Sequence, residues 1–178
     1  MLLYRDGDAG AFDALYTRHK GGLYRYLARQ CRDPALAEEL FQDVWMNLIR
    51  ARAGYAVQAK FTTYLYHLAH NRLIDHYRKH GQAIVASFDA EDGPALEELP
   101  DDRAQPPEAA VDARRQAAEL LEQIGGLPPA QREAFLLQQE GGMSVEEIAV
   151  ATGVSRETAK SRLRYATAKL RQGMGKWR

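Results

Sequence analysis

Apolar residues recur at helical spacing through most of this chain, and the alternation of apolar and polar residues that marks β-strands is almost absent. The first helical run follows Asp8, a residue type suited to capping a helix. The second begins at Asp33, with Pro34 at the first helical position, where its missing N–H is not needed. A third runs from about Phe61 to Lys79. The pattern predicts an all-α protein.

The helical pattern stops in an acidic, proline-bearing stretch that contains "DAEDGPALEELPDDRAQPPEA". Such a segment buries too little apolar surface to offset the entropy lost on ordering. We therefore expect a flexible acidic linker over residues 81–110, joining two small helical domains, 1–80 and 111–178.

Helical spacing resumes near Val111 and ends at a glycine pair, and a further helix starts with Pro129 in its first turn. The stretch "SVEEIAVATGVSRETAKSRLRYATAKLR" then holds a short apolar helix and a basic one. Ser144 and Glu147 have the spacing of a capping box, and Gly153 supplies a tight turn before the second helix.

The second of these helices has an apolar side and a cationic side. Its inward positions are Ala159, Leu163, Ala166 and Leu170. Arg156, Lys160 and Arg164 lie opposite, one per turn. This pattern is typical of a helix-turn-helix, whose second helix enters the DNA major groove. The alternative is an ordinary helical hairpin with a solvated basic face.

Net charge changes this picture only when it is followed along the chain. The 178 residues carry a formal net charge of zero, which is unusual for a nucleic-acid-binding protein. Residues 1–80, however, hold 12 Lys and Arg against 8 Asp and Glu, and residues 143–178 hold 8 against 3. Residues 81–112 hold 1 against 9. Two basic blocks flank an acidic spacer.

Several classes of protein are not expected. We find no apolar run of about 18 residues for a membrane span, and the N-terminus lacks a signal-peptide core. The single Cys31 fits a reducing cytoplasm. We find no catalytic motif and therefore expect no enzyme activity, catalytic residue, cofactor or small-molecule substrate. The spacings of His67 with His70 and of His76 with His80 suggest a metal site. Because few other possible ligands lie nearby, no metal site is expected.

Both halves of the chain resemble bacterial sigma factors of the extracytoplasmic-function (ECF) group. "LPPAQREAFLLQQEGGMSVEEIA" and the helix-turn-helix resemble the domain that reads the minus-thirty-five element. "DPALAEELFQDVW" resembles the core-polymerase-binding helix, and "FTTYLYHLAHNRLIDHYRK" the minus-ten-reading helix. Two departures are Tyr64, where tryptophan is usual, and Ala159, where valine or isoleucine is common.

The resemblance implies three sets of site residues. For core-polymerase binding they are Glu38, Glu39, Gln42 and Asp43. For the minus-ten element they are Arg50, Arg52, Tyr55 and Lys60 in a base-capturing loop, and Asn71, Arg72, Asp75, Arg78 and Lys79 on the helix. For the minus-thirty-five element they are Ser155, Arg156, Glu157, Thr158, Lys160, Ser161 and Arg164. The alternatives are a solvated helix face, a plain connector, and a surface salt-bridge ladder of Asp75 with Arg78 or Lys79.

The implied function is an alternative sigma factor, which binds core RNA polymerase and directs it to promoter DNA. The resemblance also implies an anti-sigma factor as a partner, although the sequence itself displays no site for one. The alternative function is a stand-alone helix-turn-helix regulator that binds an operator as a dimer. Such a regulator would need a ligand-binding domain or a dimerisation helix, and residues 1–80 contain neither in recognisable form.

Overall fold

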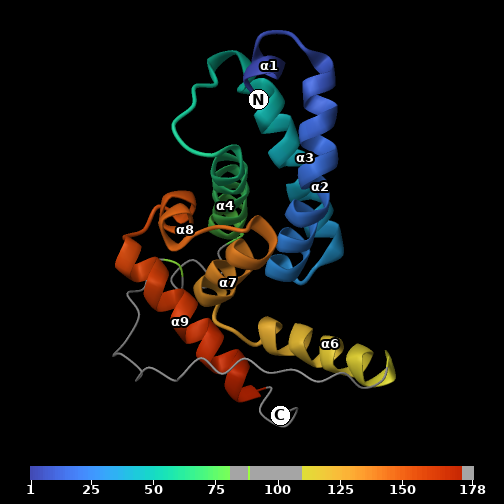
Figure 1. The fold of residues 1–178 in the computed structure, drawn as a ribbon, viewed down its shortest axis with the longest axis vertical. Coiled ribbons are helices and arrows are strands. Elements are labelled where there is room, and N and C mark those ends of the chain that lie inside the picture. The colour runs from blue at the N-terminus through green and yellow to red at the C-terminus, as the bar shows by residue number, and fades with distance from the viewer. Residues whose placement is uncertain (81–87, 89–109, 174–178) are drawn as a thin grey trace.

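The computed structural model describes residues 1–80, Phe88 and 110–173 (Figure 1). Within these residues the chain forms helices and no strand, which confirms the all-α prediction. The helices are α1 (Leu2–Arg5), α2 (Ala9–Cys31), α3 (Pro34–Arg50), the 3-10 turn η1 (Arg52–Gly54), α4 (Phe61–Lys79), α6 (Ala110–Gly125), α7 (Pro129–Gly141), α8 (Val145–Thr152) and α9 (Arg156–Gly173). The predicted linker, 81–110, lies outside the described residues except for Phe88 and Ala110.

Helix starts follow the capping residues that the sequence offers. Asp8 caps α2 and Asp33 caps α3, each accepting a hydrogen bond from a backbone amide of the first turn. Ser144 and Glu147 form the complete capping box of α8, with bonds of 3.2 and 2.9 Å. The four-residue α1 was not predicted, because so short a helix carries no periodic signal. None of the described helices is both long and apolar enough to cross a membrane.

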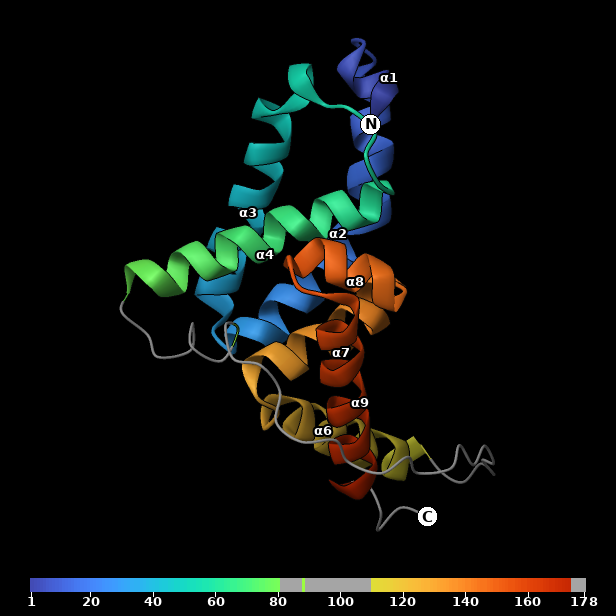
Figure 2. The same ribbon diagram turned by 90° about the vertical axis from the view of Figure 1, so that its left-hand side faces the viewer.

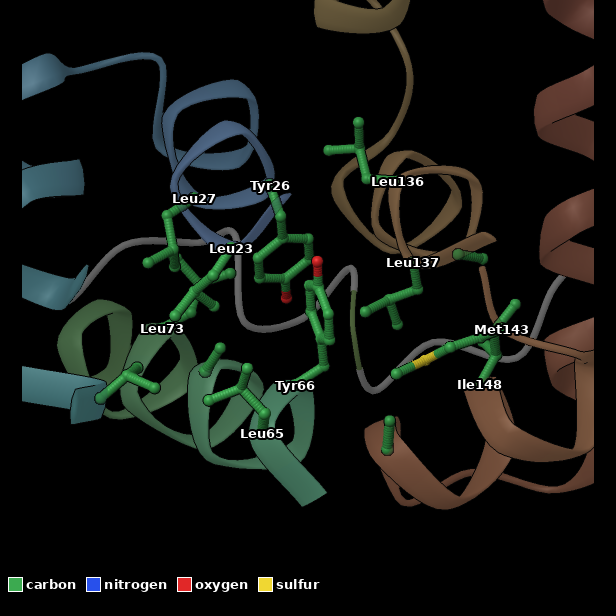
Figure 3. Packing of buried hydrophobic residues seen from close by; sticks show 14 of the residues in the cluster. Leu23, Tyr26, Leu27, Leu65, Tyr66, Leu73, Leu136, Leu137, Met143 and Ile148 are labelled. Atoms are coloured by element: carbon green, nitrogen blue, oxygen red, sulfur yellow. The ribbon is translucent and has the colours of Figure 1, made fainter. Parts of the chain in front are cut away.

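The apolar stripes of the helices meet in one continuous core that spans both halves of the chain. Fully buried leucines from α2, α3, α4 and α7 form its centre, and they include Leu23, Leu27, Leu40, Leu48, Leu65, Leu73, Leu136 and Leu137. Figure 3 shows part of this packing, with Tyr26 and Tyr66 between the two groups of leucines. Burying each such side chain contributes about 1.5–3 kcal/mol, so packing rather than helix propensity stabilises these elements.

Helices α2, α3 and α4 pack together, and α7, α8 and α9 form a second group (Figure 1). The two groups are in contact, because α7 lies against α2 and α8 lies against α4 (Figure 2). Helix α6 contacts both α9 and α2.

Gly22 explains part of this close contact. Helix α2 runs without interruption through Gly21 and Gly22, although each glycine weakens a helix by about 1 kcal/mol relative to alanine. A Cβ at Gly22 would lie 3.0 Å from the Glu140 carbonyl oxygen of α7 and 3.0 Å from the Tyr66 hydroxyl of α4. The missing side chain thus lets the C-terminal group of helices approach α2.

Candidate nucleic-acid interface

The turn between α8 and α9 has the geometry that its sequence predicts. Gly153 ends α8 in the left-handed region, with a φ of 69° that favours glycine. Val154 packs against the core. Ser155 then caps α9, since its Oγ accepts a 3.1 Å hydrogen bond from the amide of Thr158. The C-terminal segment is therefore a helix-turn-helix.

Helix α9 separates its two faces as expected. Ala159, Ala166 and Leu170 are buried, and Leu163 packs against the core. The predicted minus-thirty-five residues are on the other side: Ser155, Arg156, Glu157 and Lys160 are exposed, and Thr158, Ser161 and Arg164 are half-buried. A preformed, exposed helix start with cations is able to meet base edges and phosphates of a duplex.

Arg156 is held by carboxylates at the start of α9. Its Nε lies 2.6 Å from Oε1 of Glu146 on α8, and its Nη1 lies 3.2 Å from Oε1 of Glu157. The hydrogen bond with Glu146 raises the pKa of Arg156 and lowers the pKa of Glu146. A guanine edge would have to displace Glu146 from the guanidinium.

Two further arginines of α9 face different surroundings. The guanidinium of Arg164 lies 5.4 Å from the ring centroid of Tyr165, within the range of a cation–π contact. Arg162 is buried and donates a 2.7 Å hydrogen bond to the carbonyl oxygen of Phe88. Arg162 lies three residues after Ala159 and four before Ala166, on the inward stripe. Its burial could have been inferred from that spacing.

The predicted base-capturing loop borders a cavity of about 770 Å³. Loop residues, the first turns of α4 and one residue of α8 line it, among them Arg50, Tyr55, Thr63, Tyr64, His67 and Val150. The rings of Tyr55 and Tyr64 lie 5.1 Å apart at an interplanar angle of 63°. The Thr63 hydroxyl is buried and has no hydrogen-bond partner among the described residues. Thr63 as a whole is only 1% exposed, so its hydroxyl lies within the cavity wall and not on its surface. The hollow with its two tyrosine rings is suited to a small planar ligand.

The structure brings only part of the predicted loop set to this cavity. Arg50 and Tyr55 line it. Arg52 packs against α1 instead, with its guanidinium 5.0 Å from the Tyr4 ring centroid. Lys60 Nζ lies 2.9 Å from Oε1 of Glu147 on α8, so it pairs with the helix-turn-helix and does not line the cavity.

The predicted DNA face of α4 is largely open. Asn71, Asp75, Arg78 and Lys79 are exposed, whereas Arg72 is half-buried. Arg72 pairs with Asp43 of α3 and also lies 4.0 Å from Asp75. The alternative for this face expected Asp75 to pair with a cation after it, but the partner found is Arg72, three residues before it.

The acidic face of α3 is exposed at Glu38, Glu39 and Gln42, and Gln42 donates a 3.1 Å hydrogen bond to Glu38. The side chain of Asp43 is partly covered by its pairing with Arg72. Asp43, predicted to bind polymerase, and Arg72, predicted to bind DNA, therefore form an ion pair with each other.

The histidines have partners other than metal. His67 Nδ1 lies 2.9 Å from the Ala151 carbonyl oxygen, and His70 Nδ1 lies 2.8 Å from Oε1 of Glu133. The rings of His76 and His80 stack at 4.1 Å. The described part of the chain contains no cluster of three or more side chains that could hold a metal ion.

Comparison with known proteins assigns both halves. Residues 15–83 match the family "Sigma-70 region 2", and residues 117–170 match "Sigma-70, region 4". The chain is 33% identical to the RNA polymerase sigma factor CarQ of Myxococcus xanthus over 175 residues, which cover 98% of this chain and 95% of CarQ. The chain belongs to the sigma factor family. It is also 29% identical to the ECF RNA polymerase sigma factor SigK of Mycobacterium sp. (strain KMS), covering 94% of this chain and 85% of SigK.

The fold of this sigma factor is similar to that of a solved relative. The sigma factor RpoE from Bartonella quintana, crystallised with the anti-sigma factor NepR, superposes with a TM-score of 0.67 at 21% identity. The match covers 93% of this chain and 97% of that one. The region 2 match of the N-terminal half decides between the two functions that the sequence left open. The protein is an alternative sigma factor of the ECF group that binds core RNA polymerase and directs promoter-specific transcription initiation.

Sequence reasoning missed several residues of these surfaces. Met46 and Ile49 are 45% and 38% exposed on α3. They continue the outward row of Gln42 at spacings of four and three, which was the available signal. Thr63 and Val150 line the cavity, but no local pattern relates Val150 of α8 to α4.

Proposed function

We propose that this sigma factor uses three separate surfaces in initiation. The exposed face of α3 docks on core polymerase, the cavity beside α4 receives an unstacked promoter base, and the start of α9 reads the minus-thirty-five duplex. The observation that carries the proposal is the cavity. It combines two tyrosine rings with a buried hydroxyl that has no partner among the described residues, next to a helix with an open polar face.

The chemistry of α3 supports the docking surface. Exposed apolar side chains within a charged rim are the usual composition of a protein-binding patch, with the apolar centre supplying affinity and the rim steering the encounter. Met46 and Ile49 form the apolar part, and Glu38 and Glu39 form an acidic rim. A basic surface on the polymerase is the complementary partner.

Charge reversal tests this surface in the full-length protein. Glu39→Lys should weaken association with core polymerase, whereas Asp13→Lys, at an exposed acid of α2, should leave it unchanged. Asp43→Lys should also disturb minus-ten recognition, because it removes the partner of Arg72. Equal polymerase affinity of Glu39→Lys and the wild type would contradict the docking face.

The cavity has the chemistry of base capture. Removing a base from the stack costs a few kcal/mol, which a protein offsets by ring contacts and hydrogen bonds to the base edge. Tyr55 and Tyr64 offer rings, and the Thr63 hydroxyl, which is buried in the cavity wall, has bonding capacity that is unused within the described chain. Arg50 at the rim can contact the strand backbone. We assign capture to these residues and not to Arg52, which packs on Tyr4.

The outer face of α4 and the start of α9 complete the DNA-binding surface. Asn71 presents a donor and an acceptor to a base edge, and Arg78 and Lys79 neutralise phosphates. Arg156 and Lys160 are in the first turns of α9, where a helix-turn-helix meets base edges. Glu157 favours the helix N-terminus and is able to accept from cytosine.

Its place of action and its partners follow from this role. The factor acts in the cytoplasm, where polymerase and promoter DNA are, and it contributes binding energy rather than catalysis. An anti-sigma factor as a partner is supported by the solved relative, which was crystallised with one.

Run-off transcription with core polymerase on fragments of the genome of origin tests the function. Transcripts that start at defined promoters only when the factor is added are expected. A gel shift distinguishes a sigma factor from the alternative, a stand-alone regulator, because a dimeric regulator would bind duplex DNA without polymerase. Binding of the factor alone, with no dependence of transcription on it, would contradict the proposal.

A further inference from the structure

The loop that joins α3 to α4 and borders the base cavity rests against the short helix α1. This helix lies beside η1, the first part of the loop, and also packs against α2 (Figure 1). It has only four residues, which is too few for a helix to be stable by itself. Helix α1 is therefore held in place by its contacts, and those contacts indicate what it does.

One contact is a hydrogen bond from α1 to the backbone of the loop. Arg5 Nη1 donates to the carbonyl oxygen of Tyr55 over 3.3 Å. The backbone hydrogen bonds of η1 end at Tyr55, and residues 56–59 form no hydrogen bond with any other described residue. Within the part of the chain that the structure describes, Arg5 is thus the one side chain that donates to the backbone of this loop.

A second contact joins the start of the loop to a buried aromatic side chain of α1. The guanidinium of Arg52 lies 5.0 Å from the ring centroid of Tyr4, within the range of a cation–π contact. Tyr4 is buried, and its ring lies 5.1 Å from that of Phe12 on α2. The Phe12 ring in turn meets Trp45 of α3 edge-on at 5.8 Å. Arg52 is therefore fastened, through Tyr4, to the aromatic core of α2 and α3.

Apolar packing between α1 and the rest of the loop is looser. The two segments share a hollow of about 360 Å³, whose apolar lining is Met1, Leu2, Leu3, Tyr55, Val57, Ala59 and Phe61. Leu3 and Val57 are 67% and 62% exposed, so little of their surface is removed from water. Helix α1 thus holds the loop mainly at Arg52 and Tyr55 and not along its whole length.

Tyr55 is the residue at which the held backbone meets the cavity. Its carbonyl oxygen is bound by Arg5, while its ring lines the cavity and lies 5.1 Å from the ring of Tyr64. A ring can stack on an unstacked base at once only if it is already in place, because ordering a loop during binding lowers affinity. A contact that fixes the Tyr55 backbone therefore acts on base capture without touching the base.

We propose that Arg5 and Tyr4 of α1 are positioning residues for base capture, which hold the loop so that the Tyr55 ring forms a wall of the cavity. Asp6 assists by orienting Arg5, since its Oδ1 lies 2.8 Å from Arg5 Nε and leaves Nη1 to the Tyr55 carbonyl oxygen. Arg52 takes part as the group that Tyr4 fastens and not as a DNA contact. This inference rests on the proposed function of the cavity.

The experiment measures promoter opening by permanganate footprinting with holoenzymes of full-length chains. Arg5→Ala should lower opening by about 3- to 10-fold, the loss expected for one hydrogen bond. Arg5→Lys should retain most of it, because an ammonium can still donate to the carbonyl oxygen. Arg18→Ala, at an exposed arginine of α2, is the matched control and should open like the wild type. In a Tyr55→Ala background, Arg5→Ala should have no further effect, because the ring that it positions is gone.

Two outcomes would overturn the positioning role while leaving the cavity intact. One is a loss of opening in Tyr55→Ala with none in Arg5→Ala. The other is the same fold loss from Arg5→Ala with and without the Tyr55 ring, which a merely structural role of Arg5 would give. If Tyr55→Ala itself opens like the wild type, the proposed function of the cavity fails, and this inference fails with it. Should Arg5→Ala not fold, as circular dichroism would report, Arg5→Met, which keeps an aliphatic stem without a donor, decides instead.

Discussion

The recognition helix α9 and the cavity beside α4 are both assigned to bases, but they are built in opposite ways. Helix α9 is a regular, capped element that displays cations on its outer face. The cavity is a hollow formed by an irregular loop, two tyrosine rings and a buried hydroxyl. Bases in a duplex present their edges in a groove and can be read by a projecting helix. An unstacked base instead needs a concave site that encloses it.

The largest difference between the two regions is expected when an aromatic wall of the cavity is removed. Tyr64→Ala deletes a ring that we propose stacks on the captured base, and such stacking is worth about 1–3 kcal/mol. Promoter opening by the holoenzyme should fall by about 5- to 150-fold. Binding of the minus-thirty-five duplex should not change. Permanganate footprinting on a promoter selected by the wild-type holoenzyme measures the opening.

Tyr24→Ala is the control for this prediction, because Tyr24 is an exposed tyrosine of α2 that packs on Phe41 outside the cavity. Tyr64→Trp should retain opening, because it keeps an aromatic wall. An equal loss of opening in Tyr24→Ala and Tyr64→Ala would place the captured base elsewhere.

The next largest effect concerns α9, where we expect one cation to specify the base sequence and another only to position the helix on the phosphates. Arg156→Ala should relax preference at one position of the minus-thirty-five element, by about 5- to 150-fold for a lost bidentate contact with guanine. Arg164→Ala should weaken all promoters about equally and reduce the salt slope by about one. A promoter-library selection with each holoenzyme reads out both.

The pairing of Arg156 with Glu146 sharpens this prediction. Glu146→Gln frees the guanidinium from a competing carboxylate, so the preference at the same position should become stronger. If Arg156→Ala lowered every sequence equally, Arg156 would be a phosphate contact and the specifying residue would be another.

A smaller effect, with opposite signs in two assays, is expected at Thr63. Thr63→Val keeps the shape but removes a buried hydroxyl that lacks a partner within the described chain. The free protein should become more stable by about 1 kcal/mol, because an unsatisfied polar group is no longer buried. Affinity of the holoenzyme for minus-ten single strand should fall by a similar amount. Thermal unfolding and anisotropy measure the two changes, and a loss in both assays would mean that the hydroxyl stabilises the fold instead.

The same contrast explains what could be predicted from the sequence. Periodicity and capping are local, so the bounds of α3 and α4 and the Gly153 turn followed from residues within a few positions. The outward cations of α9 followed for the same reason. The cavity did not, because Thr63 and Val150 are far apart in the sequence and come to line one cavity only after α8 packs on α4.

The ion pairs that join distant elements were equally invisible. The family resemblance assigned Asp43 to polymerase and Arg72 to DNA, yet the two side chains pair with each other. Glu133 has the spacing of an ordinary helix position, and its burial arises only because Tyr26 and His70 supply partners from the other half. Long-range pairing of polar side chains leaves no periodic trace in the sequence.

The smallest expected effect is a pH dependence of the contact between the two halves. Burial disfavours the charged form of His70, but Glu133 outweighs it and raises the pKa of His70 above its ordinary value of 6.5. Arg162 of α9 and Arg78 of α4 also face His70 and lower that pKa. The pKa of Tyr26, which shares Glu133, is raised well above 10.0 by burial, so Tyr26 stays protonated. When the halves separate, His70 is exposed and regains its ordinary pKa.

With the two halves in contact, the protein therefore binds the proton of His70 more tightly than it does when the halves are apart. The stabilisation of the contact by His70 is complete below about pH 6.5 and is lost as the pH rises through the raised pKa of His70 in the contact. The neutral ring can still donate to Glu133, so only the ionic part disappears. The radius of gyration should accordingly rise slightly between about pH 6 and 8, and it should be independent of pH in Glu133→Gln and His70→Gln. The radius of gyration is preferred to thermal unfolding, because unfolding also exposes His19 and His76. Burial lowers the pKa of these two histidines, so they change the stability with pH in the opposite direction. Opening of the wild type as the pH falls, or an equal slope in His70→Gln, would exclude His70 as the titrating group.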